Sequence, residues 1–263
     1  YDAIDYNLSE SSVTDIRFEE LNVSLEALKL EYIGHRGHTA FRKMIAAEAG
    51  LDDENNVLLT AGAAGALFII NTSLLTEKDH LIVVRPNYAT NIEVPVTIGC
   101  SITFIDLAFE KSWKVNIAAI EAAITTATKL ISITSPHNPT GMLMKEEEIE
   151  QLIAVAESNN LILLVDETYR DACFKTPYPI MAQKSRNVIS VSSLSKAFGL
   201  PGLRMGWLIT QHTELMEQFL AAKEMIHISN SAIDEEVAYR FWPQKERFAK
   251  AINNKCMQNF EVL

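Results

Sequence analysis

The chain has 263 residues, a net charge of -11 and a hydrophobic content of 48%. Its length allows one large α/β domain, or one domain and part of another, and its composition excludes a disordered chain. The negative charge argues against nucleic acid or an anionic membrane as a partner, because either would repel the protein.

The cysteines Cys100, Cys173 and Cys256 are widely spaced and show no metal-ligand spacing. They fit a reducing compartment better than a disulfide framework, so we expect a cytoplasmic protein. No segment has the roughly eighteen uninterrupted apolar residues of a membrane span. The chain begins at Tyr1 and not at a methionine, which leaves a targeting segment open.

Apolar runs bounded by turn residues alternate with helical patterns, which is typical of βαβ units and a mainly parallel sheet. In the first half, after a polar N-terminal arm, the pattern predicts a helix at Thr39–Ala49, a strand at Val57–Thr60, a helix from Ala61 to about Leu75, strands at Leu81–Val84 and Ile102–Ile105, a helix at Ile117–Thr126 and a strand ending at Thr134.

The second half continues the alternation. Glu146–Ser158 begins with a triple glutamate, where the helix dipole favours negative charge, and its apolar residues fall on one face. Further elements are predicted as strands at Leu161–Val165, Val188–Val191 and Gly206–Thr210, a helix from about Glu214 to Glu224, and a long helix from Asp234 onward.

Lys196 lies in the most informative run of the chain. It follows the strand at Val188–Val191, Ser193 and Ser195 stand just before it, and Arg204 stands eight residues after it. A carbonyl cofactor with a phosphate needs an amine to condense with its aldehyde, and hydroxyls and a guanidinium to hold the dianion. A lone lysine at a strand end would more simply face solvent, but this one has the complete set around it.

Two further motifs follow predicted strands. Ser135-Pro136-His137-Asn138-Pro139-Thr140-Gly141 comes after the strand that ends at Thr134, and Asp166-Glu167-Thr168-Tyr169 ends the strand at Leu161–Val165. The Asn-Pro-x-Gly, Asp-x-x-Tyr and Ser-x-Ser-Lys…Arg signals have the order and spacing of the class I/II aminotransferases, the fold-type I enzymes that depend on pyridoxal phosphate. The chain resembles this family from about Tyr6 to its last residue.

The resemblance implies a fold and a domain plan. The fold is a three-layer α/β/α arrangement with a mostly parallel sheet, the large domain of these aminotransferases. Residues 1–35 would form an N-terminal arm and dimer-contact segment, 36–228 the large domain that binds pyridoxal phosphate, and 229–263 the start of a C-terminal small domain that is largely absent. In the family that small domain carries the arginine for the substrate carboxylate, so the sequence does not identify the substrate.

The resemblance also assigns the catalytic roles. Lys196 would form a Schiff base with the cofactor, and its amine would then move a proton between the substrate Cα and the cofactor C4′. Asp166 would keep the pyridine nitrogen protonated, so that the ring accepts electrons. Asn138 and Tyr169 would hydrogen-bond the phenolic oxygen of the cofactor. Read alone, Asp166 could cap a turn, and Asn138 with its following proline could be only a turn signal.

The phosphate and the ring have their own residues. Gly62-Ala63-Ala64 opens a helix after a strand, so its free backbone amides and the helix dipole are expected to face an anion. In the family pattern Ser193, Ser195 and Arg204 complete the phosphate site. Tyr88 falls where the family places an aromatic ring that stacks on the pyridine face; the alternative is an ordinary surface or core tyrosine.

Tyr32 is the candidate for contact with a second subunit. The family has a tyrosine ten residues before an arginine, with a glycine between, and Tyr32, Gly37 and Arg42 reproduce that spacing. The resemblance implies a homodimer in which Tyr32 reaches the phosphate in the neighbouring site. His35 and His38 lie in the same stretch, but a zinc site needs three or four ligands, so we expect no metal.

We expect an aminotransferase acting on an amino acid and a 2-oxo acid. A second interpretation keeps the cofactor but gives a lyase, cyclase or hydroxylase similar to the capreomycidine synthases, because the arm Asn7-Leu8-Ser9-Glu10-Ser11-Ser12 lacks the glycine that many family members have there. A third is a non-catalytic sensor domain similar to those of some transcription regulators. The short acidic arm argues against the basic DNA-binding segment of such proteins.

Overall fold

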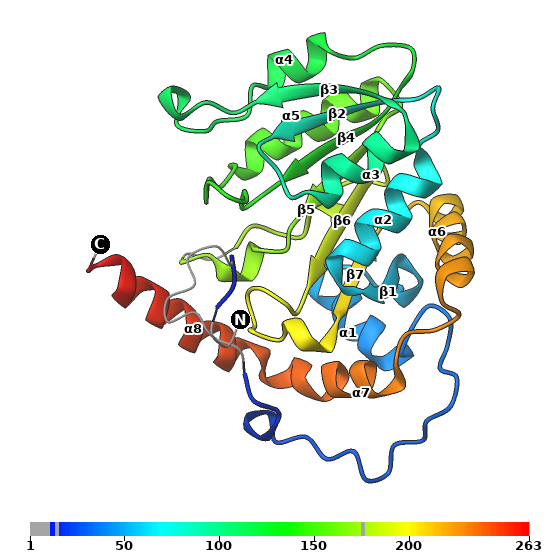
Figure 1. Ribbon diagram of the computed structural model, residues 1–263, viewed down its shortest axis with the longest axis vertical. Helices are drawn as coiled ribbons and strands as arrows, with labels where there is room; N and C mark the ends of the chain where they lie inside the picture. The colour runs from blue at the N-terminus through cyan, green and yellow to red at the C-terminus, as the bar shows by residue number, and fades with distance from the viewer. Residues whose placement is uncertain (1–10, 14–15, 175–176, 263) are drawn as a thin grey trace.

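A computed structural model describes residues 11–13, 16–174 and 177–262 (Figure 1). Its centre is a seven-stranded sheet with the order β1-β7-β6-β5-β4-β2-β3. The strands are β1 (Val57–Ala61), β2 (His80–Arg85), β3 (Ser101–Asp106), β4 (Thr128–Thr134), β5 (Ile162–Asp166), β6 (Val188–Ser193) and β7 (Met205–Ile209).

Strand β7 is antiparallel to both of its neighbours, β1 and β6. The remaining neighbours, from β6 through β5, β4 and β2 to β3, pair in parallel. The prediction of a mostly parallel sheet is therefore confirmed. Because only β7 is reversed, its amino end lies at the same edge as the carboxyl ends of the other strands, and Met205 pairs with Ala61 there.

Helices cover both faces of the sheet, and each face has its own apolar core. One core receives buried side chains from α1 (Thr39–Glu48), α4 (Ile117–Ala122), α5 (Glu146–Ser158) and α7 (Ala232–Phe241). The other receives Leu67 and Ile70 of α2 (Gly62–Leu74) together with Phe219 of α6 (Thr213–Ile226). This confirms the three-layer α/β/α architecture.

Helix α3 (Thr90–Ile98) is the one α-helix of the described chain to which the sequence pattern gave no element. It is rich in β-branched residues and contains Pro95, both of which disfavour a helix. The helix packs against α2, with Asn91 and Pro95 buried. Tertiary packing therefore outweighs local propensity in this segment.

The C-terminal region also differs from the prediction. The expected continuous helix from Asp234 is divided into α7 and α8 (Lys245–Phe260) by a 3-10 turn at Trp242–Gln244. Pro243 lies in this turn, where a proline cannot supply a helical amide donor. Helix α8 then runs outward from α7 to the C-terminal end of the chain (Figure 1). Within the described residues, no helix has both the length and the apolarity to cross a membrane.

Candidate active site

A cavity of about 240 Å³ opens at the sheet edge where the parallel strands end. Most of the residues singled out by the sequence motifs come together around it. Its lining consists of Ser11, Ala63, Ala64, Tyr88, Thr134, Asn138, Asp166, Thr168, Tyr169, Ser193, Ser195, Lys196, Pro201 and Arg204.

The sheet explains why distant motifs meet here. Asp166 is the last residue of β5, and it pairs with Thr134 of β4 and Val191 of β6. Asn138 and Lys196 follow β4 and β6 within a few residues, so both leave the sheet at the same edge. Open α/β sheets bind their ligands in the crevice beyond the carboxyl ends of the strands, and this cavity has that position.

Asp166 is buried at the floor of the cavity. Burial raises the pKa of its carboxyl group, and hydrogen bonds from Thr168 and Asn91 oppose that rise. Thr168 donates both its amide, at 3.1 Å, and its hydroxyl, at 2.6 Å, to Oδ1 of Asp166. A carboxylate that is desolvated but held by these donors is a preformed partner for a cationic group of a ligand.

The start of α2 is the part of the cavity whose chemistry suits an anion. No side chain caps the N-terminus of α2, so the amides of Ala63 and Ala64 remain available to an anion. A Cβ atom on Gly62 would lie 2.6 Å from Nη2 of Arg204, and Gly62 has a φ of +73°. The glycine therefore gives the guanidinium room beside the helix start.

Strand β7 approaches the same helix start very closely. A Cβ atom on Gly206 would lie 2.4 Å from the backbone carbonyl carbon of Gly62 and 2.6 Å from the amide nitrogen of Ala63. Only a glycine at position 206 lets the strand that follows Arg204 pack against the start of α2. Ser193 and Ser195 complete this side of the cavity, and the amide of Ser195 donates to Oγ of Ser193 at 3.3 Å.

Tyr88 forms one wall of the cavity, and its side chain is 43% exposed. The side chain of Asn87 holds its backbone: Oδ1 accepts from the amide of Tyr88 at 2.7 Å and from the hydroxyl of Thr134 at 2.9 Å. Sequence reasoning did not identify Asn87 or Thr134. Thr134 could have been suspected as the last residue of a buried strand beside the Asn138 motif.

The N-terminal arm closes the cavity at Tyr169. The hydroxyl of Tyr169 donates to Oγ of Ser11 at 2.8 Å and to the carbonyl of Ser11 at 3.1 Å. Ser11 lies in the stretch without glycine, and its side chain lines the cavity; residues 7–10 of that stretch lie outside the described residues. Thr168 and Pro201 also line the cavity without having been predicted.

Tyr32 is absent from the cavity lining and is 80% exposed. The turn that follows it is held by buried charged groups: Nζ of Lys223 donates to the carbonyl of His35 at 2.7 Å, and Nε of Arg42 donates to that of Gly37 at 3.2 Å. His38 accepts the amide of Phe41 and so caps α1. In the described parts of the chain, no three metal-binding side chains cluster.

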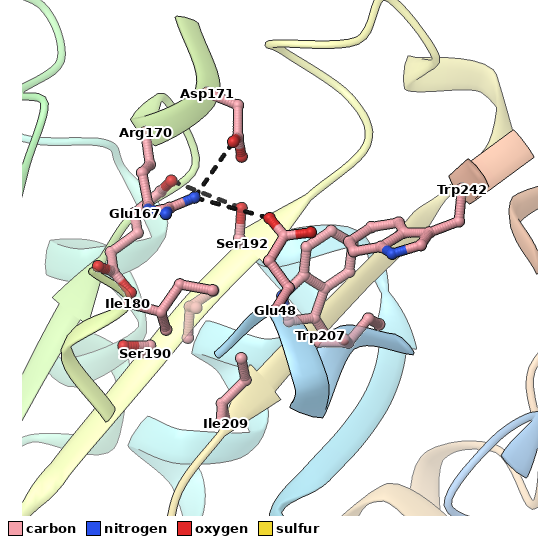
Figure 2. A pocket seen from close by; sticks show the side chains of 12 residues that line it. Glu48, Glu167, Arg170, Asp171, Ile180, Ser190, Ser192, Trp207, Ile209 and Trp242 are labelled. Carbon is pink, nitrogen blue, oxygen red and sulfur yellow. Dashed lines mark hydrogen bonds and ion pairs between the residues drawn. The ribbon is translucent and has the colours of Figure 1, made fainter. Parts of the chain in front are cut away.

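Glu167 points away from the cavity, toward the opposite face of the sheet (Figure 2). Burial raises the pKa of Glu167 to about 7, although Ser190, Arg170 and the amide of Met181 favour its ionised form. Figure 2 shows the Arg170 guanidinium between Asp171 and Glu48, at 3.1 Å and 3.7 Å. This network anchors the loop that begins with Tyr169. The end of β5 therefore places two neighbouring carboxyl groups differently: Asp166 faces the cavity, and Glu167 faces the buried network.

Comparison with known proteins gives a consistent family. The family model described as "Aminotransferase class I and II" matches residues 6–235. An aspartate aminotransferase from Musicola paradisiaca is 29% identical over 212 residues, which cover 75% of this chain and 52% of the relative. A capreomycidine synthase from Streptomyces vinaceus is 26% identical over 244 residues, covering 88% of this chain and 62% of that enzyme.

A solved structure agrees with the sequence relatives. The crystal structure of a PLP-dependent aminotransferase from Streptococcus suis superposes with a TM-score of 0.83 at 26% identity, and the match covers 90% of this chain and 67% of that one. The chain thus spans about half the length of the aspartate aminotransferase that it matches.

Proposed function

The chain belongs to the class I and II aminotransferase family, and on that premise we propose that the full-length protein transfers an amino group between an amino acid and a 2-oxo acid. Enzymes of this family use pyridoxal 5'-phosphate. The observation that carries the proposal is the cavity in which an amine, a buried carboxylate and an uncapped helix start converge: Lys196, Asp166 and Ala63 all line it.

The residues present fit this cofactor. The start of α2, with Arg204 beside Gly62, would hold the phosphate through backbone amides and a guanidinium. Asp166 would hold a proton on the pyridine nitrogen, and that cation would in turn compensate the desolvation that raises the pKa of the carboxyl group. Tyr88 would pack on the ring, while Asn138 and Tyr169 would donate to its phenolic oxygen.

When bound, pyridoxal phosphate supplies an aldehyde that captures amines and a ring that accepts electrons from the substrate. Lys196 would anchor the aldehyde covalently through Nζ. As a free amine, Nζ of Lys196 would move a proton between the substrate Cα and C4′ of the cofactor. Asp166 and its donor Thr168 are both buried, so they would shield the ring nitrogen from water on the sheet side.

We also propose a homodimer in which Tyr32 reaches the phosphate of the neighbouring site. Its exposure supports this, as does the buried anchoring of the following turn by Lys223 and Arg42. The segments that Lys223 and His35 join also expose the large apolar side chains of Leu30 and Met225.

The division into an arm at 1–35, a cofactor domain at 36–228 and the start of a second domain at 229–263 is part of the same proposal. Unpaired cysteines support a cytoplasmic location.

A second candidate is cyclase or lyase chemistry at the same site. Two observations favour it: the capreomycidine synthase of Streptomyces vinaceus matches over 88% of this chain, and the arm presents the side chain of Ser11 to the cavity. The products separate the candidates. Equal amounts of a 2-oxo acid and an aminated acceptor indicate transfer, whereas ammonia or a cyclic product formed without an acceptor indicates elimination or cyclisation.

The first experiment is cofactor capture by the purified full-length protein. We expect a visible absorption band with pyridoxal phosphate, and borohydride reduction should fix the cofactor on the peptide that contains Lys196. The Lys196→Ala variant should lose both the fixation and steady-state turnover. A folded protein that gains no band would overturn the proposal and favour a binding module, and full turnover by Lys196→Ala without added amine would exclude the assigned role.

A further inference from the structure

His137 precedes Asn138 and is 2% exposed. Its Nδ1 lies 2.9 Å from the hydroxyl of Thr140, and its Nε2 lies 2.9 Å from the backbone carbonyl of Pro86. Both ring nitrogens are therefore engaged, one within its own loop and one in a different loop. The buried ring is the point at which these two loops are joined.

The partners determine the protonation of the ring. A carbonyl oxygen only accepts hydrogen bonds, so Nε2 of His137 carries the hydrogen that it shares with Pro86. Burial lowers the pKa of the imidazole, which leaves Nδ1 as an acceptor for the hydroxyl of Thr140. That hydroxyl oxygen in turn accepts the amide of Met142 at 3.3 Å. The chain of donors runs in one direction, from Met142 through Thr140 and His137 to Pro86.

The two joined loops carry the two sides of the proposed cofactor site. Pro86 follows β2 and stands two residues before Tyr88, and His137 follows β4 directly before Asn138. Strands β2 and β4 are parallel neighbours, so their loops leave the same edge of the sheet. The hydroxyl of Thr134 makes a second link to the Tyr88 loop, at Asn87, on the strand side of His137.

We propose that His137 is a positioning residue that sets the spacing between the Tyr88 wall and the side chain of Asn138. This inference rests on the proposed binding of pyridoxal phosphate, whose ring would lie against Tyr88 while its phenolic oxygen faces Asn138. A stacked ring and a hydrogen bond to its edge are both met only at a defined separation of the two loops. His137 fixes that separation without touching the cofactor cavity, whose lining it does not join.

The test compares three variants of the full-length protein with the wild type. His137→Leu removes both hydrogen bonds, whereas His137→Gln can place an amide nitrogen near the position of Nε2 and still donate to Pro86. His80→Leu is the matched control, because buried His80 bridges Thr128 and Thr103 in the same manner, at 2.8 Å and 2.9 Å, at the opposite end of β2. The probe is pyridoxal phosphate. Two quantities are measured for each variant: the dissociation constant of the probe and the pH midpoint of its bound absorption band.

We expect His137→Leu to weaken cofactor binding about tenfold, which is the effect of losing one hydrogen bond, here the one from Asn138 to the cofactor. The pH midpoint of the bound absorption band should shift as well. His137→Gln should stay near the wild type. His80→Leu should lower the melting temperature without moving either cofactor readout. Where His137→Leu does not fold, Thr140→Val, which removes the donor to Nδ1, serves in its place with the same expected direction.

Three results would overturn the proposal: an unchanged midpoint and affinity in His137→Leu, equal defects in the Gln and Leu variants, or the same cofactor shifts in His80→Leu. Failure of the proposed function is distinguishable, because the wild-type protein itself would then bind no pyridoxal phosphate. A positioning role is separated from a purely structural one by the midpoint, which the loss of folding stability alone does not move.

Discussion

The guanidinium of Arg204 occupies the space that a side chain on Gly62 would fill, since a Cβ atom there would lie 2.6 Å from Nη2. Gly62→Ala should therefore weaken the binding of pyridoxal phosphate by at least about tenfold, because Arg204 must leave the start of α2. The titration of the visible band measures this effect.

Gly99→Ala is the control for Gly62→Ala. Gly99 also has a positive φ, +85°, but a Cβ atom there would meet nothing within 4 Å. Both alanines should cost about 1–2 kcal/mol of folding stability from the left-handed backbone. Only the Gly62 variant should lose cofactor affinity; an equal loss in both would mean that strain, and not the position of Arg204, is responsible.

The hydrogen bond from Tyr169 to Ser11 leads to a second prediction. Tyr169→Phe removes the hydroxyl from both Ser11 and the proposed cofactor oxygen, so it should shift the pH midpoint of the bound absorption band. Ser11→Ala removes only the Oγ acceptor and keeps the Tyr169 hydroxyl, whose single hydrogen would turn to the cofactor oxygen when the cofactor is bound, so this variant should leave the midpoint unchanged. A shift of the same size in Ser11→Ala would contradict the assigned role of Tyr169.

Glu167 predicts a dependence of stability on pH. Its pKa rises from 4.5 in the unfolded chain to about 7 in the folded protein, chiefly through burial. The folded state therefore holds the proton more tightly, and the stability from this group is complete below about pH 4.5 and is lost as the pH rises through 7. The difference is roughly 3 kcal/mol.

Glu167→Gln should remove this pH dependence, which denaturant unfolding at a series of pH values measures. The exposed Glu121→Gln provides the control and should leave the profile unchanged. If the wild-type profile persists in Glu167→Gln, the carboxyl group does not titrate as its burial implies.

Lys223 and Glu235 give a prediction on folding stability. Both are fully buried, and Lys223 has a pKa lowered to about 8, first by burial, with Glu235 acting in the opposite direction. Lys223→Met should cost several kcal/mol, on the order of 3–5, because it removes the cation with the largest electrostatic effect on buried Glu235 and the donor to the carbonyl of His35. The double variant Lys223→Met/Glu235→Gln should recover part of that loss in a double-mutant cycle. Strictly additive losses would show that the two charges are not coupled.

The positions of the strands could be predicted well from the sequence, because buried parallel strands are continuous apolar runs between turn residues. Their carboxyl ends, where the motifs lie, could be predicted for the same reason. It did not predict α3, where Pro95 and β-branched residues disfavour a helix that packing against α2 stabilises. The turn at Trp242–Gln244 was also not expected, although Pro243 is a visible signal for a break.

For the site, the motifs identified residues for which a direct chemical role is proposed, such as Lys196 and Asp166. Their roles stay predictions, although the structure brings them to one cavity. The residues that hold them, such as Thr168 and Asn87, carry no motif because an ordinary threonine or asparagine acquires its function only from its neighbours. Local patterns do not specify contacts such as Tyr169 with Ser11, which are 158 positions apart.

The pairing of β1 with β7 also bears on how the protein folds. The proposed anion site lies where Ala61 pairs with Met205. This contact joins segments far apart in the chain, and such contacts form late when loop closure is costly. A ligand held at this site can bind only those protein molecules in which β1 and β7 have already paired. Pyridoxal phosphate should therefore slow unfolding while leaving the refolding rate nearly unchanged, so that the cofactor protects the finished protein without guiding its assembly.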